Sequence, residues 1–329
     1  MLRSDTNPSN GDTSLPLIIV NPRSASGATS EKWSATASDL RSHFGPFAVE
    51  FTEFGGHAID LAEKAAKSGR RFIIACGGDG TINEVANGIL RSGEDVELGV
   101  MPSGTGGDFR RTIGLPIKNR DVAAKLRDGQ TKMIDAGKVT FLGHSGETVS
   151  RYFLNVSSFG LAADVIARVK VAQPFDWLPN EALRGKANFA ASTLHEVFDL
   201  NPVNIRVKLD NGDERTLQTI NFCVANSRYF GGGMMIAPDA LLSDGLLDVI
   251  NIGDIGTAKI LLNAYTLYRG THNQLKEVQS TLARRIEAAA VNPSEKIEIE
   301  VDGELLGRLP AVYEIVPNAI RVRIPLSRA

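Results

Sequence analysis

The first third of the chain alternates between short apolar segments and stretches with helical spacing. Four apolar runs have the length of strands: residues 17–20, 49–51, 71–76 and 96–101. Between them, Ile59, Ala62 and Ala66 fall on one face of a predicted helix. A second helix, over residues 81–90, directly follows a glycine-rich turn. Strands that alternate with helices are typical of a parallel sheet, so we predict an α/β domain over residues 1–136.

After Asp135 the apolar runs shorten and pair through turns. Two pairs of runs are predicted hairpins: residues 138–142 with 152–156, and residues 203–209 with 216–224. The second pair flanks Asp210-Asn211-Gly212, and Asn-Gly is a strong hairpin signal. We therefore predict an antiparallel, β-rich second domain over residues 137–308. Helical insertions are expected at 181–198 and 256–290, and residues 309–329 are expected to return to the first domain.

Composition narrows the class of protein. Apolar residues make up 43% of the chain and charged residues 22%, which is typical of a globular protein, and the net charge of -2 does not favour nucleic-acid binding. Cys76 and Cys223 each lie in an apolar run, so we interpret both as buried thiols in a reducing compartment. Residues 1–15 lack the apolar stretch of a signal peptide, and no run reaches the roughly 20 apolar residues of a membrane-spanning helix. We expect a cytoplasmic protein whose membrane contact, if any, is peripheral.

The segment from Gly77 to Glu84, Gly-Gly-Asp-Gly-Thr-Ile-Asn-Glu, lies between a predicted strand and a predicted helix. Glycines let backbone N–H groups approach a phosphate, and the start of the helix adds further donors. Asp79 would repel a phosphate unless Mg²⁺ bridges the two. The alternative is that Asp79 or Thr81 caps the helix. The turn matches neither the P-loop nor the dinucleotide-binding fingerprint.

Two more polar turns follow predicted strands. Pro102 to Arg111 contains Gly104, Gly106 and Gly107, and Asn21 to Gly27 leaves the first strand. Loops at the carboxyl ends of neighbouring parallel strands lie side by side, so one ligand could touch all three turns. The sequence therefore predicts a phosphate-binding crevice at this edge of the sheet.

These motifs resemble the diacylglycerol kinase catalytic-domain family, which includes sphingosine kinases and bacterial lipid kinases. The turn at 77–84 is also similar to that of NAD kinases and phosphofructokinases. Four further segments resemble family motifs in order along the chain: 102–111, 153–160, 238–247 and 301–304. Gly107 stands where the family usually has Asn. The resemblance covers residues 18 to about 324 and implies an NAD kinase-like α/β nucleotide-binding domain with a second, β-sandwich domain.

The resemblance also implies site residues for an ATP-dependent, Mg²⁺-requiring lipid kinase. The residues expected to contact ATP are Asn21, Pro22, Arg23, Ser24, Ala25, Thr52, Gly78, Asp79, Gly80, Thr81, Ile82, Asn83, Glu84 and Thr105. Asp79, Asp108 and Asp135 would form a carboxylate cluster near a catalytic Mg²⁺, and Glu304 would be the general base. A structural Mg²⁺ would be held by Asp244 with the backbone carbonyls of Leu241 and Leu246. Without the resemblance, Glu304 and Asp244 could equally be ordinary turn residues.

The expected lipid substrate requires an apolar surface. Residues 165–200 are the candidate, because aromatic and aliphatic residues cluster there beside Arg184 and Lys186. A buried core is the alternative interpretation of the same spacing. Three functions stay open at this point: phosphorylation of a diacylglycerol-like lipid in phospholipid biosynthesis, an NAD kinase or other small-molecule kinase, and a non-catalytic nucleotide-binding regulator. A homodimer also stays open.

Overall fold

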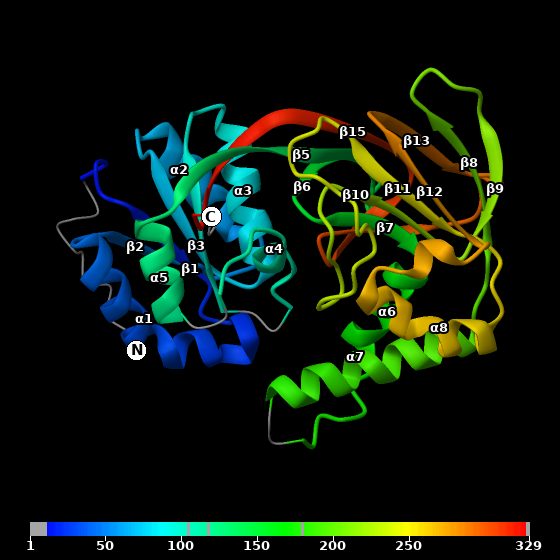
Figure 1. The fold of residues 1–329 in the computed structure, drawn as a ribbon, viewed down its shortest axis with the longest axis horizontal. Helices are drawn as coiled ribbons and strands as arrows, with labels where there is room; N and C mark the ends of the chain where they lie inside the picture. Colours follow the sequence, from blue (N-terminus) through cyan, green and yellow to red (C-terminus); the bar gives the residue numbers. More distant parts are fainter. Residues whose placement is uncertain (1–11, 104–105, 117–118, 179–180, 327–329) are drawn as a thin grey trace. The chain divides into compact units, whose positions relative to one another are not determined.

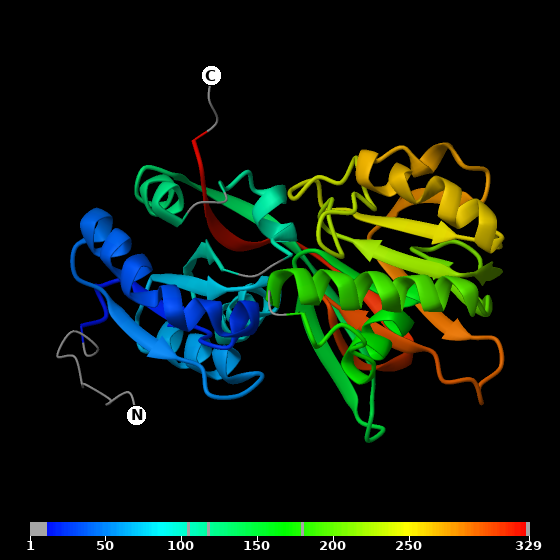
Figure 2. The same ribbon diagram turned by 90° about the horizontal axis from the view of Figure 1, so that it is seen from below.

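The computed structural model describes residues 12–103, 106–116, 119–178 and 181–326. These residues form two compact units (Figures 1 and 2). The first contains the chain up to Ile134 and again from Asn318, and the second contains residues 135–317. In the described part of the chain, no helix combines the length and the apolar character that crossing a bilayer requires.

The first unit contains a parallel sheet whose strands lie in the order β4 (Glu97–Pro102), β3 (Phe72–Gly77), β1 (Leu17–Val20) and β2 (Ala48–Phe51). The end of β15 (Glu304–Ile324) adds a parallel neighbour to β4, with Arg321 opposite Glu97. All four strands predicted for this domain are present within a residue of the expected bounds. Strands β1, β3 and β4 are almost wholly buried, because helices cover both faces of a parallel sheet, whereas the edge strand β2 is partly exposed.

The described residues of the first unit include five α-helices that connect and cover these strands: α1 (Ala28–Phe44), α2 (His57–Lys67), α3 (Asp79–Ser92), α4 (Asp108–Thr112) and α5 (Asn119–Arg127). Helix α2 packs on α3, and α1 packs on α5 (Figure 1). The predicted apolar face of α2, Ile59, Ala62 and Ala66, is buried. Strands β1 and β3 are neighbours at the centre of the sheet. The chain passes from β1 to β2 on one side and from β3 to β4 on the other side. Because crossovers are right-handed, the sheet has a switch point between β1 and β3, where ligands of such sheets bind.

The second unit is a sandwich of two antiparallel sheets. One sheet has the order β12 (Val278–Ala283), β11 (Leu247–Ile252), β10 (Asn221–Ala225), β7 (Val156–Gly160), β14 (Glu298–Val301) and β15. The other contains β9 (Arg215–Thr219), β8 (Val203–Leu209), β13 (Arg285–Ala290), β15, β5 (Gln130–Gly143) and β6 (Thr148–Phe153). Strand β15 belongs to both. One apolar core, which includes Phe153, Phe159, Phe222 and Tyr313, draws its residues from both sheets, as a sandwich requires.

Two details of the second unit differ from the sequence prediction. Within the predicted helix over 256–290, the α-helix α8 spans only Thr257–Arg269, because Gly270 adopts a left-handed conformation (φ 67°) and ends it, and a short 3-10 helix follows at His272–Gln274. Residues 278–290 form β12 and β13 instead. The predicted strand over 216–224 is divided at Ile220, where the chain changes partners: β9 pairs with β8, and β10 pairs with β7 and β11. Helices α6 (Leu161–Val171) and α7 (Glu181–Phe198) complete this unit, and α7 matches the expected insertion at 181–198.

Candidate nucleotide-binding and catalytic site

The turns after β1 and β3 are tied together by hydrogen bonds. The amide of Asn21 donates to Thr81 Oγ1 at 3.0 Å, and Ser24 Oγ lies 3.5 Å from the same atom. Ser24 Oγ also accepts the N–H of Gly78 at 3.4 Å. These bonds hold the Asn21 turn against the start of α3, at the switch point of the sheet. The expectation that neighbouring glycine turns meet at one edge is thus met by the first two turns.

The turn after β4 joins the same edge. Ser103 donates its backbone N–H to the carbonyl oxygen of Gly77 at 2.8 Å, and its hydroxyl accepts a hydrogen bond from Thr29 Oγ1 at 2.8 Å. Thr29 lies in the first turn of α1. Three segments that are far apart in the sequence are therefore fixed to one another around the ends of β1, β3 and β4.

Asp79 links the second and third turns. Its carboxylate oxygens accept the N–H groups of Asp108 at 3.2 Å and of Phe109 at 3.1 Å, at the start of α4. Asp79 therefore caps α4 rather than its own helix, α3, which has Gly78 as N-cap and no side-chain capping bond. Among the described residues, no side-chain capping bond is made at the start of α3, a helix of 14 residues. Such a helix start attracts anions through its dipole and its free donors.

The glycines beside Asp79 are required by this geometry. A Cβ on Gly106 would lie 2.7 Å from Asp79 Oδ2, which is closer than atoms can pack. Gly107 has φ 65° and ψ 39°, a left-handed conformation that Gly and Asn adopt more readily than other residues. The family residue Asn and the Gly107 of this chain therefore suit the same backbone. Arg111 forms an ion pair with the buried carboxylate of Asp108 at 2.8 Å.

The other predicted nucleotide contacts occupy varied positions around this edge. Glu84 accepts the N–H groups of Gly56 at 3.0 Å and Ala58 at 3.2 Å, so its carboxylate caps α2. Thr52, Asn83 and Ile82 are buried, which leaves mainly their backbone to face a ligand. Of the remaining predicted residues, Pro22 and Arg23 lie in the turn after β1, Ala25 lies in the short 3-10 helix Ser24–Gly27, and Gly80 lies in the first turn of α3. Thr105 lies outside the described residues.

In the second unit, Glu304 follows a tight hairpin turn between β14 and β15. Asp302 and Gly303 form the turn with φ values of 46° and 89°. The carboxylate of Asp302 accepts three backbone N–H groups, from Leu154 at 2.9 Å, Asn155 at 3.0 Å and Val156 at 3.0 Å. The turn is therefore anchored to the start of β7, and the half-buried Glu304 lies at a fixed end of a strand.

Glu300 lies beneath the same turn, and the sequence analysis did not single it out. It is 3% exposed. Its carboxylate accepts hydrogen bonds from Ser158 Oγ at 2.5 Å and from the N–H of Gly303 at 2.9 Å. Burial raises the pKa of Glu300 to about 7, the Ser158 and Gly303 hydrogen bonds oppose that shift, and the charge of Asp302 adds to it. No sequence signal singled it out, because Glu298 and Glu300 alternate with Ile299 and Val301 as in a strand with one face in water.

Asp135 belongs to the second unit and fixes the predicted metal-binding loop. It is buried, its N–H donates to the carbonyl oxygen of Leu242 at 2.7 Å, and its Oδ2 accepts the N–H of Gly245 at 2.8 Å. Asp244 is exposed, and its Oδ1 accepts the N–H of Leu246 at 3.1 Å. Within the first unit, Asp79 and Asp108 are adjacent, as the hydrogen bond between them shows.

The loop around Asp244 fits a hard cation. Burial raises the pKa of Asp248 to about 6, and the carboxylates of Asp244 and Asp239 add to this rise. Three carboxylates are thus near one another, and Arg228 only partly offsets them. Oxygen donors with excess negative charge suit Mg²⁺. No set of three His, Cys, Asp or Glu side chains with metal-binding geometry occurs in the described part of the chain, so backbone carbonyls such as those of Leu241 and Leu246 would have to complete the ligands.

Residues 165–200 place much of their apolar surface in solvent. Trp177, Leu183, Leu194 and Phe198 are all exposed, whereas Val197 is buried. The segment therefore fits both interpretations in part, because α7 buries Val197 and exposes Leu194 and Phe198.

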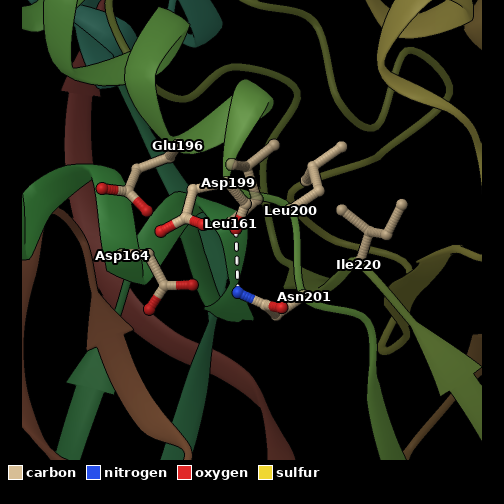
Figure 3. A pocket seen from close by; sticks show the side chains of 7 residues that line it. All are labelled: Leu161, Asp164, Glu196, Asp199, Leu200, Asn201 and Ile220. Atoms are coloured by element: carbon tan, nitrogen blue, oxygen red, sulfur yellow. Dashed lines mark hydrogen bonds between the residues drawn. The ribbon is translucent and has the colours of Figure 1, made fainter.

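A pocket of about 220 Å³ lies beside α7 (Figure 3). Its lining residues are Leu161, Asp164, Glu196, Asp199, Leu200, Asn201 and Ile220. Burial raises the pKa of Asp164 to about 6, with a further contribution from Glu196. Three carboxyl groups make this pocket unsuited to an acyl chain.

Comparison with known proteins identifies the family. The Diacylglycerol kinase catalytic domain family matches residues 16–139, and the YegS C-terminal NAD kinase beta sandwich-like domain family matches residues 158–324. The chain is 31% identical over 311 residues to a diacylglycerol kinase of Mycobacterium tuberculosis (strain CDC 1551 / Oshkosh), covering 93% of this chain and 94% of that protein. The chain belongs to the diacylglycerol kinase catalytic-domain family. Its membership of a family of lipid kinases, expected from the motifs, is confirmed.

Two further comparisons agree. A diacylglycerol kinase of Bacillus subtilis (strain 168) is 30% identical over 283 residues, which are 84% of this chain and 86% of that protein. A crystal structure of a diacylglycerol kinase from Bacillus anthracis str. Sterne superposes with a TM-score of 0.69 at 21% identity, over 95% of this chain and 97% of that one. The structural likeness supports the fold, an α/β domain with an NAD kinase-like β-sandwich, as the sequence predicted.

Proposed function

We propose that this protein transfers the γ-phosphoryl group of ATP to a hydroxyl group of a diacylglycerol-like membrane lipid. The observation that carries the proposal is the edge of the parallel sheet, where three turns are hydrogen-bonded together around the start of α3. This edge offers backbone donors to phosphate oxygens, and phosphoryl transfer depends mainly on positioning and charge neutralisation. The names of the relatives favour a lipid as acceptor.

In the proposed reaction, the lipid hydroxyl oxygen attacks the γ-phosphorus, and the bond from that phosphorus to the β-phosphate oxygen breaks. ADP leaves, and the hydroxyl proton passes to the carboxylate of Glu304. A carboxylate base contributes roughly 100-fold or more to such a step. Asp302 holds the turn that carries Glu304 by accepting three backbone N–H groups.

Divalent cations have two proposed places in this scheme. Asp79 and Asp108 would hold a catalytic Mg²⁺, with Asp135 as the third member of the set proposed from the family resemblance. The loop of Leu241, Asp244 and Leu246 would hold a structural one. When bound, Mg²⁺ neutralises charge on the phosphate oxygens. The chain itself orients Asp79 through the N–H groups of Asp108 and Phe109.

The test is transfer of label from γ-labelled ATP with Mg²⁺ to four acceptors offered separately: diacylglycerol, phosphatidylglycerol, a sphingoid base and NAD. We expect label in a glycerolipid, with Glu304→Gln reducing turnover about 100-fold or more. Glu314→Gln, a change of a surface carboxylate in the same strand, is the matched control and should keep full activity. Label in NAD alone would show a small-molecule kinase, and label in none of the four would show a nucleotide-binding regulator.

A further inference from the structure

Glu300 is a buried titratable group that the proposed chemistry does not use. It lies in β14, with Ser158 of β7 opposite it on one side and Leu305 of β15 on the other. A carboxyl group in this position costs free energy, and a strand residue here would ordinarily be apolar. The retention of a carboxyl group therefore calls for a physical reason.

The hydrogen bonds of Glu300 supply that reason. Oε2 accepts the N–H of Gly303, the second residue of the turn, at 2.9 Å, and Oε1 accepts the hydroxyl of Ser158 at 2.5 Å. The side chain thus bridges β7 to the turn, and the next residue after Gly303 is Glu304. Asp302 holds the turn from its other side through the N–H groups of residues 154–156.

We propose that Glu300 is a positioning residue for the carboxylate of Glu304, and that it holds the Asp302-Gly303 turn in its active geometry only when Glu300 itself is ionised. The inference rests on the proposed function, because it assigns Glu304 the role of base. An ionised carboxylate forms a stronger hydrogen bond to an N–H group than a neutral carboxyl does. When Glu300 binds a proton, the bond to Gly303 weakens and the turn becomes less well fixed.

The neighbours of Glu300 allow this titration near neutral pH. Burial raises its pKa to about 7, and the charge of Asp302 on the turn adds to that rise. Cys223 of β10 and Tyr313 of β15 also interact with Glu300, and burial raises the pKa of each of these groups, so both stay neutral over the range in which Glu300 ionises. The contribution of Glu300 to turnover therefore appears as pH rises through about 7.

The first experiment follows the Gly303 amide itself. Protein labelled with ¹³C′-Asp and ¹⁵N-Gly gives amide signals from only four Asp-Gly pairs, one of which is Asp302-Gly303. We expect the Gly303 signal to move with a midpoint near pH 7 in the wild type and to be flat in Glu300→Gln. In Ser158→Ala the midpoint should move to higher pH. The hydrogen bond from Ser158 lowers the pKa of Glu300 in the wild type, so its removal raises that pKa. A Gly303 signal that does not titrate near pH 7 would overturn the proposal.

The second experiment compares kcat at saturating substrate from pH 5.5 to 8.5. Glu300→Gln should turn over about 10-fold more slowly than the wild type at pH 8.5 and equal it at pH 5.5, because small misplacements of a catalytic group are costly. Ser158→Ala should move the wild-type inflection upward, as in the amide titration. A Glu300→Gln profile that coincides with the wild type at every pH would contradict the positioning role. If the wild type transfers no label at all, the proposed function fails, and the amide titration still decides separately whether Glu300 fixes the turn.

Discussion

In the first unit, the carboxylates of Asp79 and Glu84 each accept two backbone N–H groups at the start of a helix, whereas in the second unit Glu300 and Asp248 are buried between strands. A carboxylate at a helix start accepts N–H groups that have no partner within the helix. A carboxyl group between strands loses hydration, and its pKa rises, to about 7 for Glu300 and about 6 for Asp248. The comparison indicates that the edge proposed to bind the nucleotide depends on backbone geometry, and that the turn before Glu304, the proposed base, depends on the protonation of Glu300.

The largest expected effect is on stability, at the turn of the second unit. Asp302→Ala removes the acceptor of three backbone N–H groups, and we expect the free energy of unfolding to fall by about 3 kcal/mol, since each lost bond costs roughly 1 kcal/mol. Urea denaturation measures it. Asp210→Ala is the matched control: Asp210 also has a positive φ and accepts two backbone N–H groups, but these bonds are exposed, so its change should cost about 1 kcal/mol. Equal costs would contradict the importance given to the Asp302 anchor.

The second prediction concerns the pH dependence of stability. The folded state keeps the proton of Glu300 up to about pH 7, whereas the unfolded chain releases it near the ordinary value of 4.5. The contribution of Glu300 to stability is therefore complete below pH 4.5 and is lost as pH rises to about 7, by an amount on the order of 3 kcal/mol.

Glu300→Gln should remove this dependence and make the protein more stable than the wild type at pH 8. Urea denaturation of both proteins at pH 5 and pH 8 checks it. The prediction is contradicted if the free energy of unfolding of the wild type, relative to that of Glu300→Gln, rises from pH 5 to pH 8. The same change should lower activity at pH 8, so the charge that orients the turn is retained at a cost in stability.

The third prediction tests the nucleotide edge of the first unit. In Gly106→Ala, the new Cβ must displace the Asp79 carboxylate from its place 2.7 Å away, so we expect turnover to fall about 10-fold. Gly55→Ala is the control, because a Cβ there meets nothing within 4 Å and its φ is not positive. Both are measured by kcat and by calorimetric nucleotide binding. Unchanged values for Gly106→Ala would show that Asp79 has no part in the site.

The smallest effect is expected at Glu84. Glu84→Gln weakens the cap of α2 and should lower the free energy of unfolding by about 1 kcal/mol. If Glu84 acts only as a cap, nucleotide affinity stays unchanged. A loss of affinity beyond the loss of stability would support the predicted contact between Glu84 and ATP.

Much of this picture could be predicted from the sequence, and the exceptions have physical causes. The four strands of the first unit and its helices α2 and α3 follow from apolar spacing, and the Asp302-Gly303 turn follows from its residue types, whereas α1, α4 and α5 were not predicted. The sequence analysis predicted a helix over residues 278–290, where the structure has strands. The alanines of β13 have a high helix propensity, and they give no apolar and polar alternation in the sequence although their burial alternates.

The candidate site also has a part that the sequence predicted and a part that it did not. The glycine turns were predictable because several glycines between a strand and a helix are typical of phosphate-binding turns. Glu300 was not, because Ile299 and Glu300 alternate as in a strand with one face in water, whereas β14 lies between β7 and β15 and buries both residues. The cap that Asp79 forms on α4 depends on two turns meeting in space, which no local pattern encodes.

Strand β15, with 21 residues, contributes to both units, so neither unit can be encoded separately as a complete sheet. The strand begins at Glu304, beside the Asp302-Gly303 turn, and near its other end pairs Arg321 with Glu97 of the first unit. A gene fragment that stops at Ile134 would encode the first unit with β4 as an unpaired edge strand, and such edges recruit other chains into aggregates. Recombination could exchange the whole pair of units between relatives, but not either one alone.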